Sequence, residues 1–115
     1  MLGRLLGKEA ILLRKSTLVA GQHPVHTLTF ATPTGAALGV YIHLGGVVKI
    51  FIPGARRPLR SYSVSAERPG EFEVTFKLYR GGRGSGYLNG LLIGDAVRFR
   101  VMNNCALLHA VFRAE

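Results

Sequence analysis

The 115-residue sequence predicts an all-β domain with one short helix, arranged as an antiparallel barrel or sandwich of six strands. Three observations support this fold class: short runs of β-branched and aliphatic residues, proline and glycine turns between them, and a single segment with helical spacing. The length fits one domain, because domains commonly hold about 100 to 150 residues. With 48% hydrophobic residues, the composition is that of a folded protein and not of a disordered chain.

The first three expected strands lie in the N-terminal half of the chain. Ala10–Val19 and Val25–Ala31 are rich in β-branched and aliphatic residues, and a turn containing glycine and proline separates them. Thr32–Gly39 contains a proline and two glycines and is therefore predicted to be a loop. Val47–Ile52 is a short apolar run that ends at a Pro-Gly turn signal, so we expect it to be the third strand.

The second half of the chain contains three further strands and the helix. Leu59–Ser65 alternates serines with larger side chains, and Glu71–Tyr79 alternates apolar with polar residues more regularly than any other segment. Ser85–Leu92 has its apolar residues at helical spacing behind a glycine-rich loop, which predicts a short helix with Ser85 near its N-cap. Ala96–Val101 is then expected to be the last strand of the core.

Positive charge is the most unusual property of the composition. The net charge is +9, and eleven of the 15 basic residues are arginine. No acidic residue stands between Ala10 and Ala66. Such a basic surface predicts a polyanionic partner, which would be nucleic acid, a membrane surface or a phosphate-bearing cofactor.

Other classes of protein are excluded by what the sequence contains. The only cysteine, Cys105, rules out an internal disulfide and a zinc or iron–sulfur site with several cysteines. The four histidines stand apart from carboxylates, so we expect no bound metal. No apolar run approaches the roughly 20 residues that a membrane-spanning helix needs. Met1–Gly21 is basic and leucine-rich and is only weakly suggestive of organelle targeting, so the compartment stays open.

Two clusters of residues can carry chemistry, and the first is the run Arg56–Ser63 at the start of the fourth strand. If the strand alternates, Arg60 and Tyr62 share one face, while Ser61 and Ser63 share the other. An arginine beside an aromatic ring offers a charge for a phosphate and a flat surface for a planar ring. The alternative reading is a basic edge strand with a tyrosine in the core.

The second cluster is the glycine-rich segment Arg80–Gly86 between the most regular strand and the helix. Glycines allow backbone N–H groups to curl around an anion, and two arginines and Ser85 add charges and a hydroxyl. The segment is neither a Walker loop nor a Rossmann fingerprint, because it lacks the Gly-Lys-Ser/Thr of the first and the strand context of the second. Alternatively, it is a flexible connection only.

Together the two clusters resemble the FAD-binding (FR-type) barrel of the ferredoxin–NADP reductase superfamily. The signatures of that family are Arg-x-Tyr-Ser/Thr and a Gly-x-x-Ser/Thr loop that opens the only helix of the barrel. They stand here as Arg60–Ser63 (RSYS) and Gly82–Ser85 (GRGS), at the spacing of the cytochrome b5 reductase-like and oxygenase-reductase branches. The resemblance spans Glu9–Arg100 and implies a six-stranded antiparallel Greek-key barrel that binds FAD.

The resemblance also implies a role for each motif residue. In the family the arginine pairs with the FAD diphosphate, the tyrosine packs against the isoalloxazine ring, and the hydroxyl residue lies beside flavin N5, which accepts the hydride. These roles fall on Arg60, Tyr62 and Ser63, so Ser63 is the expected catalytic residue. The full set of expected cofactor-binding residues is Arg60, Ser61, Tyr62, Ser63, Thr75, Lys77, Tyr79, Gly82, Arg83, Gly84 and Ser85.

We expect residues 1–101 to form the FAD-binding barrel and residues 102–115 to be a divergent tail. The family follows its barrel with a pyridine-nucleotide domain of over a hundred residues, which this sequence lacks. The resemblance thus implies the FAD-binding domain of an NAD(P)H oxidoreductase that delivers electrons to a haem or iron–sulfur acceptor and that is not active alone. The sequence leaves open the acceptor, the choice of NADH or NADPH, the oligomeric state, and whether the chain is a fragment or a natural short protein.

Two other interpretations remain. A small basic β-barrel could bind single-stranded nucleic acid, because Arg80–Gly84 (RGGRG) superficially resembles an RGG segment. That function predicts a steep loss of affinity with salt and no preference for flavin, whereas our favoured interpretation has FAD and no nucleic acid as the partner. The other possibility is a non-functional remnant whose apolar tail, Cys105–Phe112, would promote aggregation.

Overall fold

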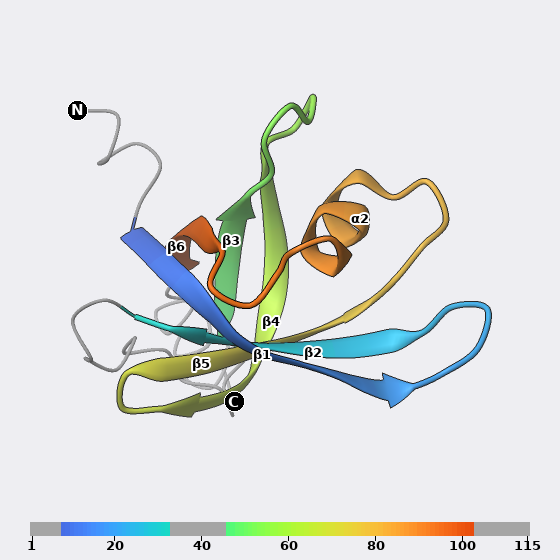
Figure 1. Cartoon of the computed structure of the whole chain (residues 1–115). Coiled ribbons are helices and arrows are strands. Elements are labelled where there is room, and N and C mark those ends of the chain that lie inside the picture. The colour runs from blue at the N-terminus through green and yellow to red at the C-terminus, as the bar shows by residue number, and fades with distance from the viewer. Residues whose placement is uncertain (1–7, 33–45, 103–115) are drawn as a thin grey trace, which may run out of the picture.

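Alternating apolar and polar side chains build the strands of this domain, which the computed structural model describes over residues 8–32 and 46–102. The elements are β1 (Lys8–Val19), β2 (Val25–Ala31), β3 (Val47–Phe51), β4 (Leu59–Arg68), β5 (Glu71–Lys77), α2 (Arg83–Asn89) and β6 (Ala96–Met102). The strands close into an antiparallel barrel in the order β1-β2-β5-β4-β3-β6 (Figure 1).

The order of the strands is that of a Greek key. β3, β4 and β5 follow one another as neighbours, and β6 returns after the helix to pair with β3. β6 also pairs with β1, which closes the barrel and leaves no sheet edge along that side. The predicted six-stranded antiparallel barrel with one short helix is therefore confirmed.

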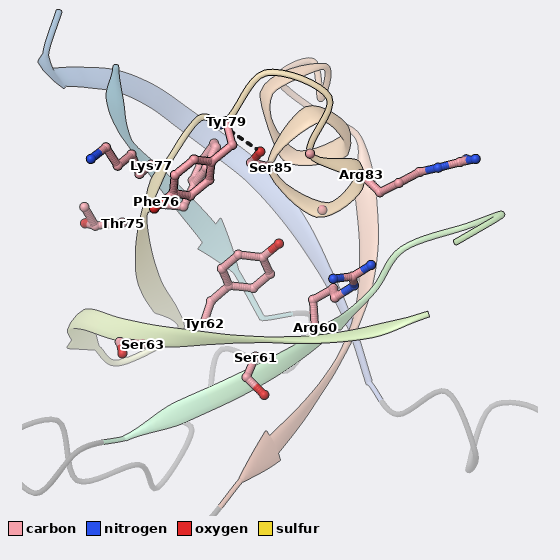
Figure 2. A pocket seen from close by; sticks show the side chains of 12 residues that line it. Arg60, Ser61, Tyr62, Ser63, Thr75, Phe76, Lys77, Tyr79, Arg83 and Ser85 are labelled. Carbon is pink, nitrogen blue, oxygen red and sulfur yellow. Dashed lines mark hydrogen bonds between the residues drawn. The ribbon is translucent and has the colours of Figure 1, made fainter. Parts of the chain in front are cut away.

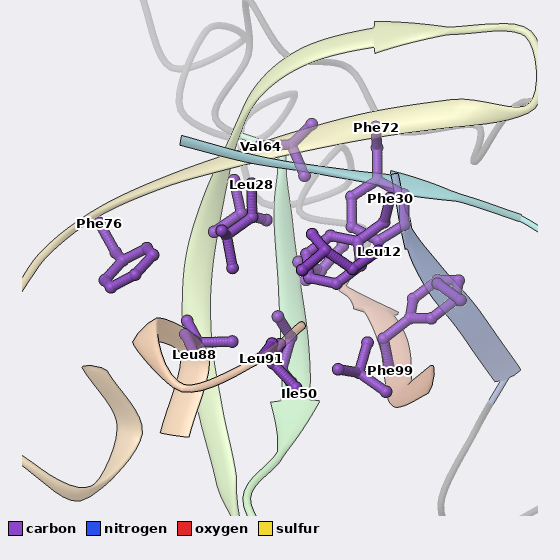
Figure 3. Close-up of a cluster of buried hydrophobic side chains, with 14 of the residues drawn as sticks. Leu12, Leu28, Phe30, Ile50, Val64, Phe72, Phe76, Leu88, Leu91 and Phe99 are labelled. Carbon is purple, nitrogen blue, oxygen red and sulfur yellow. The ribbon is translucent and has the colours of Figure 1, made fainter. Parts of the chain in front are cut away.

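Aromatic and aliphatic side chains fill the interior of the barrel. Phe30, Phe72 and Phe99 are fully buried, and the ring of Phe72 lies 5.3 Å from that of Phe30 and 5.1 Å from that of Phe99, between centroids (Figure 3). Leu88 of α2 and Leu91 after it enter the same cluster and are also buried. The helix is thus fastened to the barrel by its apolar side chains.

Lys15 of β1 binds the C-terminal end of α2. Its Nζ donates to the backbone carbonyls of Asn89 at 2.7 Å and Leu91 at 2.8 Å. The last carbonyls of a helix receive no hydrogen bond from N–H groups of the same helix. A cation near them also interacts favourably with the helix dipole. A lysine distant in the sequence therefore caps this short helix.

Ser85 lies near the N-cap, as predicted, but it is not the cap, and the predicted bounds of the helix are wrong. The first helical hydrogen bond joins the Gly86 N–H to the Gly82 carbonyl at 2.9 Å, so Gly82 is the N-cap and α2 begins two residues earlier than predicted. The Ser85 hydroxyl instead accepts the backbone N–H of Tyr79 at 3.2 Å. The helix also ends three residues earlier than predicted, at Asn89.

Smaller differences concern the ends of the strands. β1 begins at Lys8 because it pairs there with Phe99 of β6, and β4 continues to Arg68 along β5. β5 ends at Lys77, two residues before the predicted end, because the chain then enters the turn that leads to α2. The predicted loop after β2, most of the predicted tail and the first seven residues lie outside the described residues. No helix within the described ranges is long and apolar enough to cross a membrane.

Candidate functional site

The candidate site is a cleft that opens where β4 and β5 part. Within the described residues these strands pair only between Val64–Arg68 and Glu71–Val74, with a β-bulge between Val64 and Ala66. Beyond the bulge, the first half of β4 pairs with β3 alone and the end of β5 pairs with β2 alone. A cleft of about 590 Å³ lies between the two separated strands and the start of α2 (Figure 2).

Both separated strands turn backbone polar groups toward this cleft. The N–H of Val64 donates to the carbonyl of Gly46 at 3.1 Å, on the β3 side. Because these groups alternate in direction along a strand, Ser61 and Ser63 direct theirs toward the opposite edge, which borders the cleft. In β5 the N–H of Leu78 points away from the cleft, toward the start of β2. By the same alternation, the residue before it directs its backbone groups toward the cleft. The cleft therefore offers main-chain donors and acceptors from two walls.

All eleven residues predicted to bind a cofactor line this one cleft. They come from β4, the end of β5 and the glycine-rich turn into α2, and they are Arg60, Ser61, Tyr62, Ser63, Thr75, Lys77, Tyr79, Gly82, Arg83, Gly84 and Ser85. Their contacts with a ligand stay predictions. Sequence reasoning missed Phe76 as a lining residue, because strict alternation assigned it to the core. No sequence signal could have found it, because its access to the cleft depends on β4 leaving β5 just before it.

Tyr62 forms the floor of the cleft beneath α2. Its ring is half-buried and packs against the hydrophobic core, and it points in the opposite direction from Ser61 (Figure 2). Burial raises the pKa of its hydroxyl, an effect that the nearby charge of Arg60 opposes. A side chain at Gly84 would bring its Cβ within 2.5 Å of the Tyr62 Oη, so this position accepts only glycine at the present spacing. The helix therefore rests directly on the tyrosine.

Positive charge gathers at one end of the cleft. Figure 2 shows Arg60 and Arg83 together there, with Lys77 and Tyr79 at the other end. The Nε of Arg60 donates to the Arg57 carbonyl at 3.0 Å, which orients the guanidinium and keeps its two terminal nitrogens for other acceptors. None of the residues described around the cleft is acidic. This end is consequently suited to an anion.

The glycine-rich turn is shaped by close packing around Ser85. A Cβ at Gly82 would lie 2.7 Å from the Ser85 Oγ and 3.3 Å from the Tyr79 carbonyl oxygen, and Gly81 has a φ of +74° that favours glycine. Gly82 supplies no capping side chain, so the N–H groups of the first turn of α2 have no acceptor in the helix. The Ser85 hydroxyl accepts from Tyr79 and still has its own proton to donate.

Tyr79 closes the opposite end of the cleft. The residue is 55% exposed, and its ring centroid lies 5.8 Å from the Lys77 Nζ and 6.1 Å from the ring of His23. An exposed aromatic beside a cation suits the edge of a planar ligand or a sugar. Among the described residues, no group of three or more His, Cys, Asp or Glu is placed to hold a metal ion.

Residues 11–103 of the sequence match the family described as the oxidoreductase FAD-binding domain. The chain belongs to this family. Its cofactor is FAD, and the resemblance to the ferredoxin–NADP reductase superfamily is confirmed. The single-stranded nucleic-acid alternative is not favoured by this assignment.

Several solved structures share the fold of this FAD-binding domain. They include ferredoxin-NADP+ reductase from Plasmodium falciparum (TM-score 0.66, 22% identity), which covers 82% of this chain and 36% of its own. The flavohem-like FAD/NAD-binding domain of a Vibrio cholerae nitric oxide dioxygenase matches with a TM-score of 0.66 and 24% identity, covering 81% and 42%. The cytochrome b5 reductase domain of Ulva prolifera nitrate reductase gives 0.62 and 20%, covering 80% and 39%. The chain thus spans well under half of each of these chains. Comparison with curated proteins finds no match.

Proposed function

We propose that this domain holds FAD in the cleft between β4, β5 and α2 and works within an NAD(P)H-dependent oxidoreductase that reduces a haem or iron–sulfur acceptor. The observation that supports it is the convergence of two arginines, a half-buried tyrosine and a tight glycine turn on one cleft of about 590 Å³. A dinucleotide with a planar ring and a diphosphate requires those three features. When bound, FAD supplies the redox step, and the protein supplies orientation and electrostatics.

Arg60 and Arg83 are assigned to the diphosphate. Both lie at the same end of the cleft, and guanidinium groups bind phosphate oxygens through two parallel hydrogen bonds (Figure 2). The glycine turn at Gly82 and Gly84 allows the backbone to approach closely, and the Ser85 hydroxyl adds a donor. These groups fit the charged part of FAD.

Tyr62 and the strand residues around it are assigned to the isoalloxazine ring and the ribityl chain. The protonated Tyr62 ring gives a flat apolar surface, and Ser61 and Ser63 add hydroxyls from β4. In this assignment the Ser63 hydroxyl donates to flavin N5, which makes Ser63 the catalytic residue. Thr75, Lys77 and Tyr79 complete the binding site from β5 and the turn after it.

The remaining parts of the reaction belong to other domains or chains of the whole protein. We assign residues 1–101 to the FAD site and residues 102–115 to the position where the family continues into its pyridine-nucleotide domain. The NAD(P)H site and the electron acceptor are then partners of this barrel. Exposed cations of the cleft, such as Lys77 and Arg83, would favour the approach of anionic partners.

Titration of the purified chain with FAD, followed by quenching of flavin fluorescence, tests this function. Arg60→Ala is expected to weaken FAD binding about tenfold or more, because hydrogen bonds to charged groups contribute about 1.5–3 kcal/mol. Arg98→Ala is the matched control, since it removes the same charge from an exposed position on β6 outside the cleft. Absence of FAD binding, or equal losses for both variants, would contradict the proposal.

A further inference from the structure

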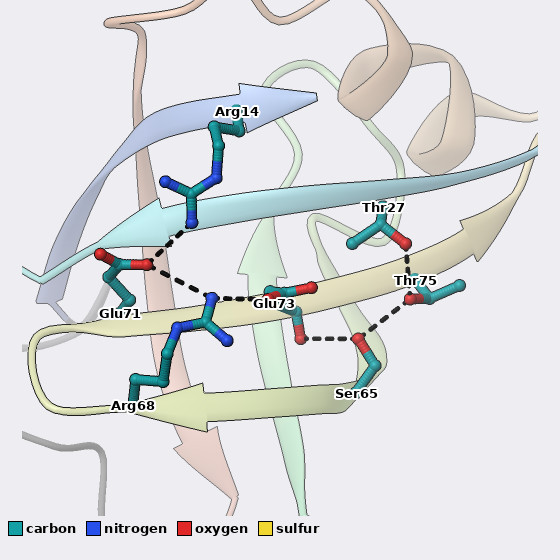
Figure 4. A network of polar contacts seen from close by, with 7 residues as sticks. All are labelled: Arg14, Thr27, Ser65, Arg68, Glu71, Glu73 and Thr75. Atoms are coloured by element: carbon teal, nitrogen blue, oxygen red, sulfur yellow. Dashed lines mark hydrogen bonds and ion pairs between the residues drawn. The ribbon is translucent and has the colours of Figure 1, made fainter. Parts of the chain in front are cut away.

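A chain of hydroxyl groups crosses the barrel surface beside the cleft (Figure 4). The Oγ1 atoms of Thr27 and Thr75 lie 3.0 Å apart, and the Thr75 Oγ1 donates to the Ser65 Oγ at 2.9 Å. The Ser65 Oγ in turn donates to the backbone carbonyl of Glu73 at 3.3 Å. Ser65 reaches these partners because it lies at the β-bulge where β4 begins to leave β5.

The direction of every bond in this chain follows from proton counting. A hydroxyl has one proton, and a carbonyl oxygen has none, so the proton of Ser65 goes to Glu73. Ser65 therefore accepts from Thr75, whose single proton is used in that bond. Thr27 must then be the donor in its bond with Thr75. Thr75 has no proton left and can offer a ligand only a lone pair.

Thr75 is thus an acceptor beside a donor. It is half-buried on the wall of the cleft, and Lys77 lines the same cleft with an ammonium group. A ligand edge that complements this pair carries an N–H next to a carbonyl group. The pyrimidine part of the isoalloxazine ring has such an edge, with N3–H beside C2=O.

We propose that Thr75 accepts a hydrogen bond from flavin N3–H and thereby sets which edge of the ring faces β5, an inference that rests on FAD being the ligand of this cleft. Thr75 is then a specificity-determining residue that favours flavins with an unsubstituted N3. Ser65 acts through it, because its bond keeps the Thr75 proton away from the ligand. The role requires the oxygen of residue 75 and not the shape of its side chain.

Binding of FAD and 3-methyl-FAD, measured by flavin fluorescence, tests the proposal. The wild-type chain should bind FAD more tightly than 3-methyl-FAD. Thr75→Val should weaken FAD about fivefold, the size of a neutral hydrogen bond, and leave the affinity for 3-methyl-FAD unchanged. Thr75→Ser should restore the preference, since it keeps the oxygen.

Thr27→Val is the matched control, because it breaks the same 3.0 Å bond from the side away from the cleft. It should keep the wild-type ratio of the two affinities, and circular dichroism should show that all variants fold. Equal losses of affinity for both flavins in Thr75→Val, or a changed ratio of the two affinities in Thr27→Val, would overturn the proposed role of Thr75. The FAD site itself would not be affected by that result. Failure of the wild-type chain to bind either flavin would overturn the FAD site together with this inference.

Discussion

The contact between α2 and Tyr62 predicts an unusual response to substitution of Gly84 by alanine. The added Cβ would lie 2.5 Å from the Tyr62 Oη and 3.4 Å from the Arg60 Cγ. Since unstrained heavy-atom contacts begin at about 3.5 Å, the tip of the tyrosine or the helix must move by about 1 Å. That movement displaces the surface and the charge that we assign to FAD.

Stability should change little in this variant, and FAD affinity should change more. Alanine gains about 1 kcal/mol over glycine within a helix, which offsets part of the cost of about 1–3 kcal/mol for overpacking. The atom that clashes is the far end of a side chain, so Tyr62 can swing aside and keep the overpacking cost at the lower end. We expect Gly84→Ala to weaken FAD binding about tenfold, which corresponds to about 1.4 kcal/mol.

A double-mutant cycle with Tyr62→Phe isolates the cause. Once the hydroxyl is removed, the nearest tyrosine atom to the new Cβ is Cζ at 3.8 Å, an ordinary contact. Gly84→Ala should then cost little FAD affinity in the Tyr62→Phe background, with a coupling of about 1 kcal/mol between the two changes. Fluorescence titration and thermal unfolding of the four proteins give the measurement. Equal losses in both backgrounds would refute the claim that the tyrosine hydroxyl sets the position of the helix.

Two further predictions concern interactions outside the cleft. Lys15→Met should destabilise the domain by about 1 kcal/mol in urea unfolding, because the carbonyls at the end of α2 lose their donor, while Lys8→Met on the same strand should change stability by less than about 0.5 kcal/mol. The pKa of Glu71 is held below its ordinary value, first by the hydrogen bond from Arg14 and also by Arg68. This stabilisation is present above the ordinary glutamate pKa and is lost as the pH falls through the lowered one. Glu71→Gln should therefore flatten the acid side of the curve of Tm against pH.

The regular parts of the fold follow from local sequence, whereas the cleft depends on contacts between distant residues. Alternation places Phe72 and Val74 inside the barrel correctly, because a strand with one buried face has a period of two. All residues of the RSYS and GRGS motifs line the cleft, whereas Thr75, Lys77 and Tyr79 were predicted from the family resemblance and Phe76 was not predicted. Neither pattern predicts the bulge at Ser65, because a bulge depends on the register of the partner strand.

The error at the helix start has the same origin. Serine before an apolar helical pattern is normally an N-cap, since its oxygen accepts a first-turn N–H. Here the turn from β5 brings the N–H of Tyr79 to the Ser85 Oγ, and Gly82 takes the cap position. Likewise, Lys15 stands 74 residues before the first carbonyl that it caps, so no local pattern could indicate it. Local preference gives way to the geometry of neighbouring strands at both ends of this helix.

The distribution of charge along β5 explains how a basic protein can direct an anion to one place. Glu71 and Glu73 stand at one end of this strand and pair with Arg14 and Arg68 (Figure 4). The other end carries Lys77 and borders the cleft, whose described lining contains no carboxylate. Arg14 and Arg68 neutralise these two acids, so they reduce the potential at the cleft less than unpaired carboxylates would. The lack of acids in the described lining, and not the total charge of +9, therefore makes the cleft the favoured place for a diphosphate.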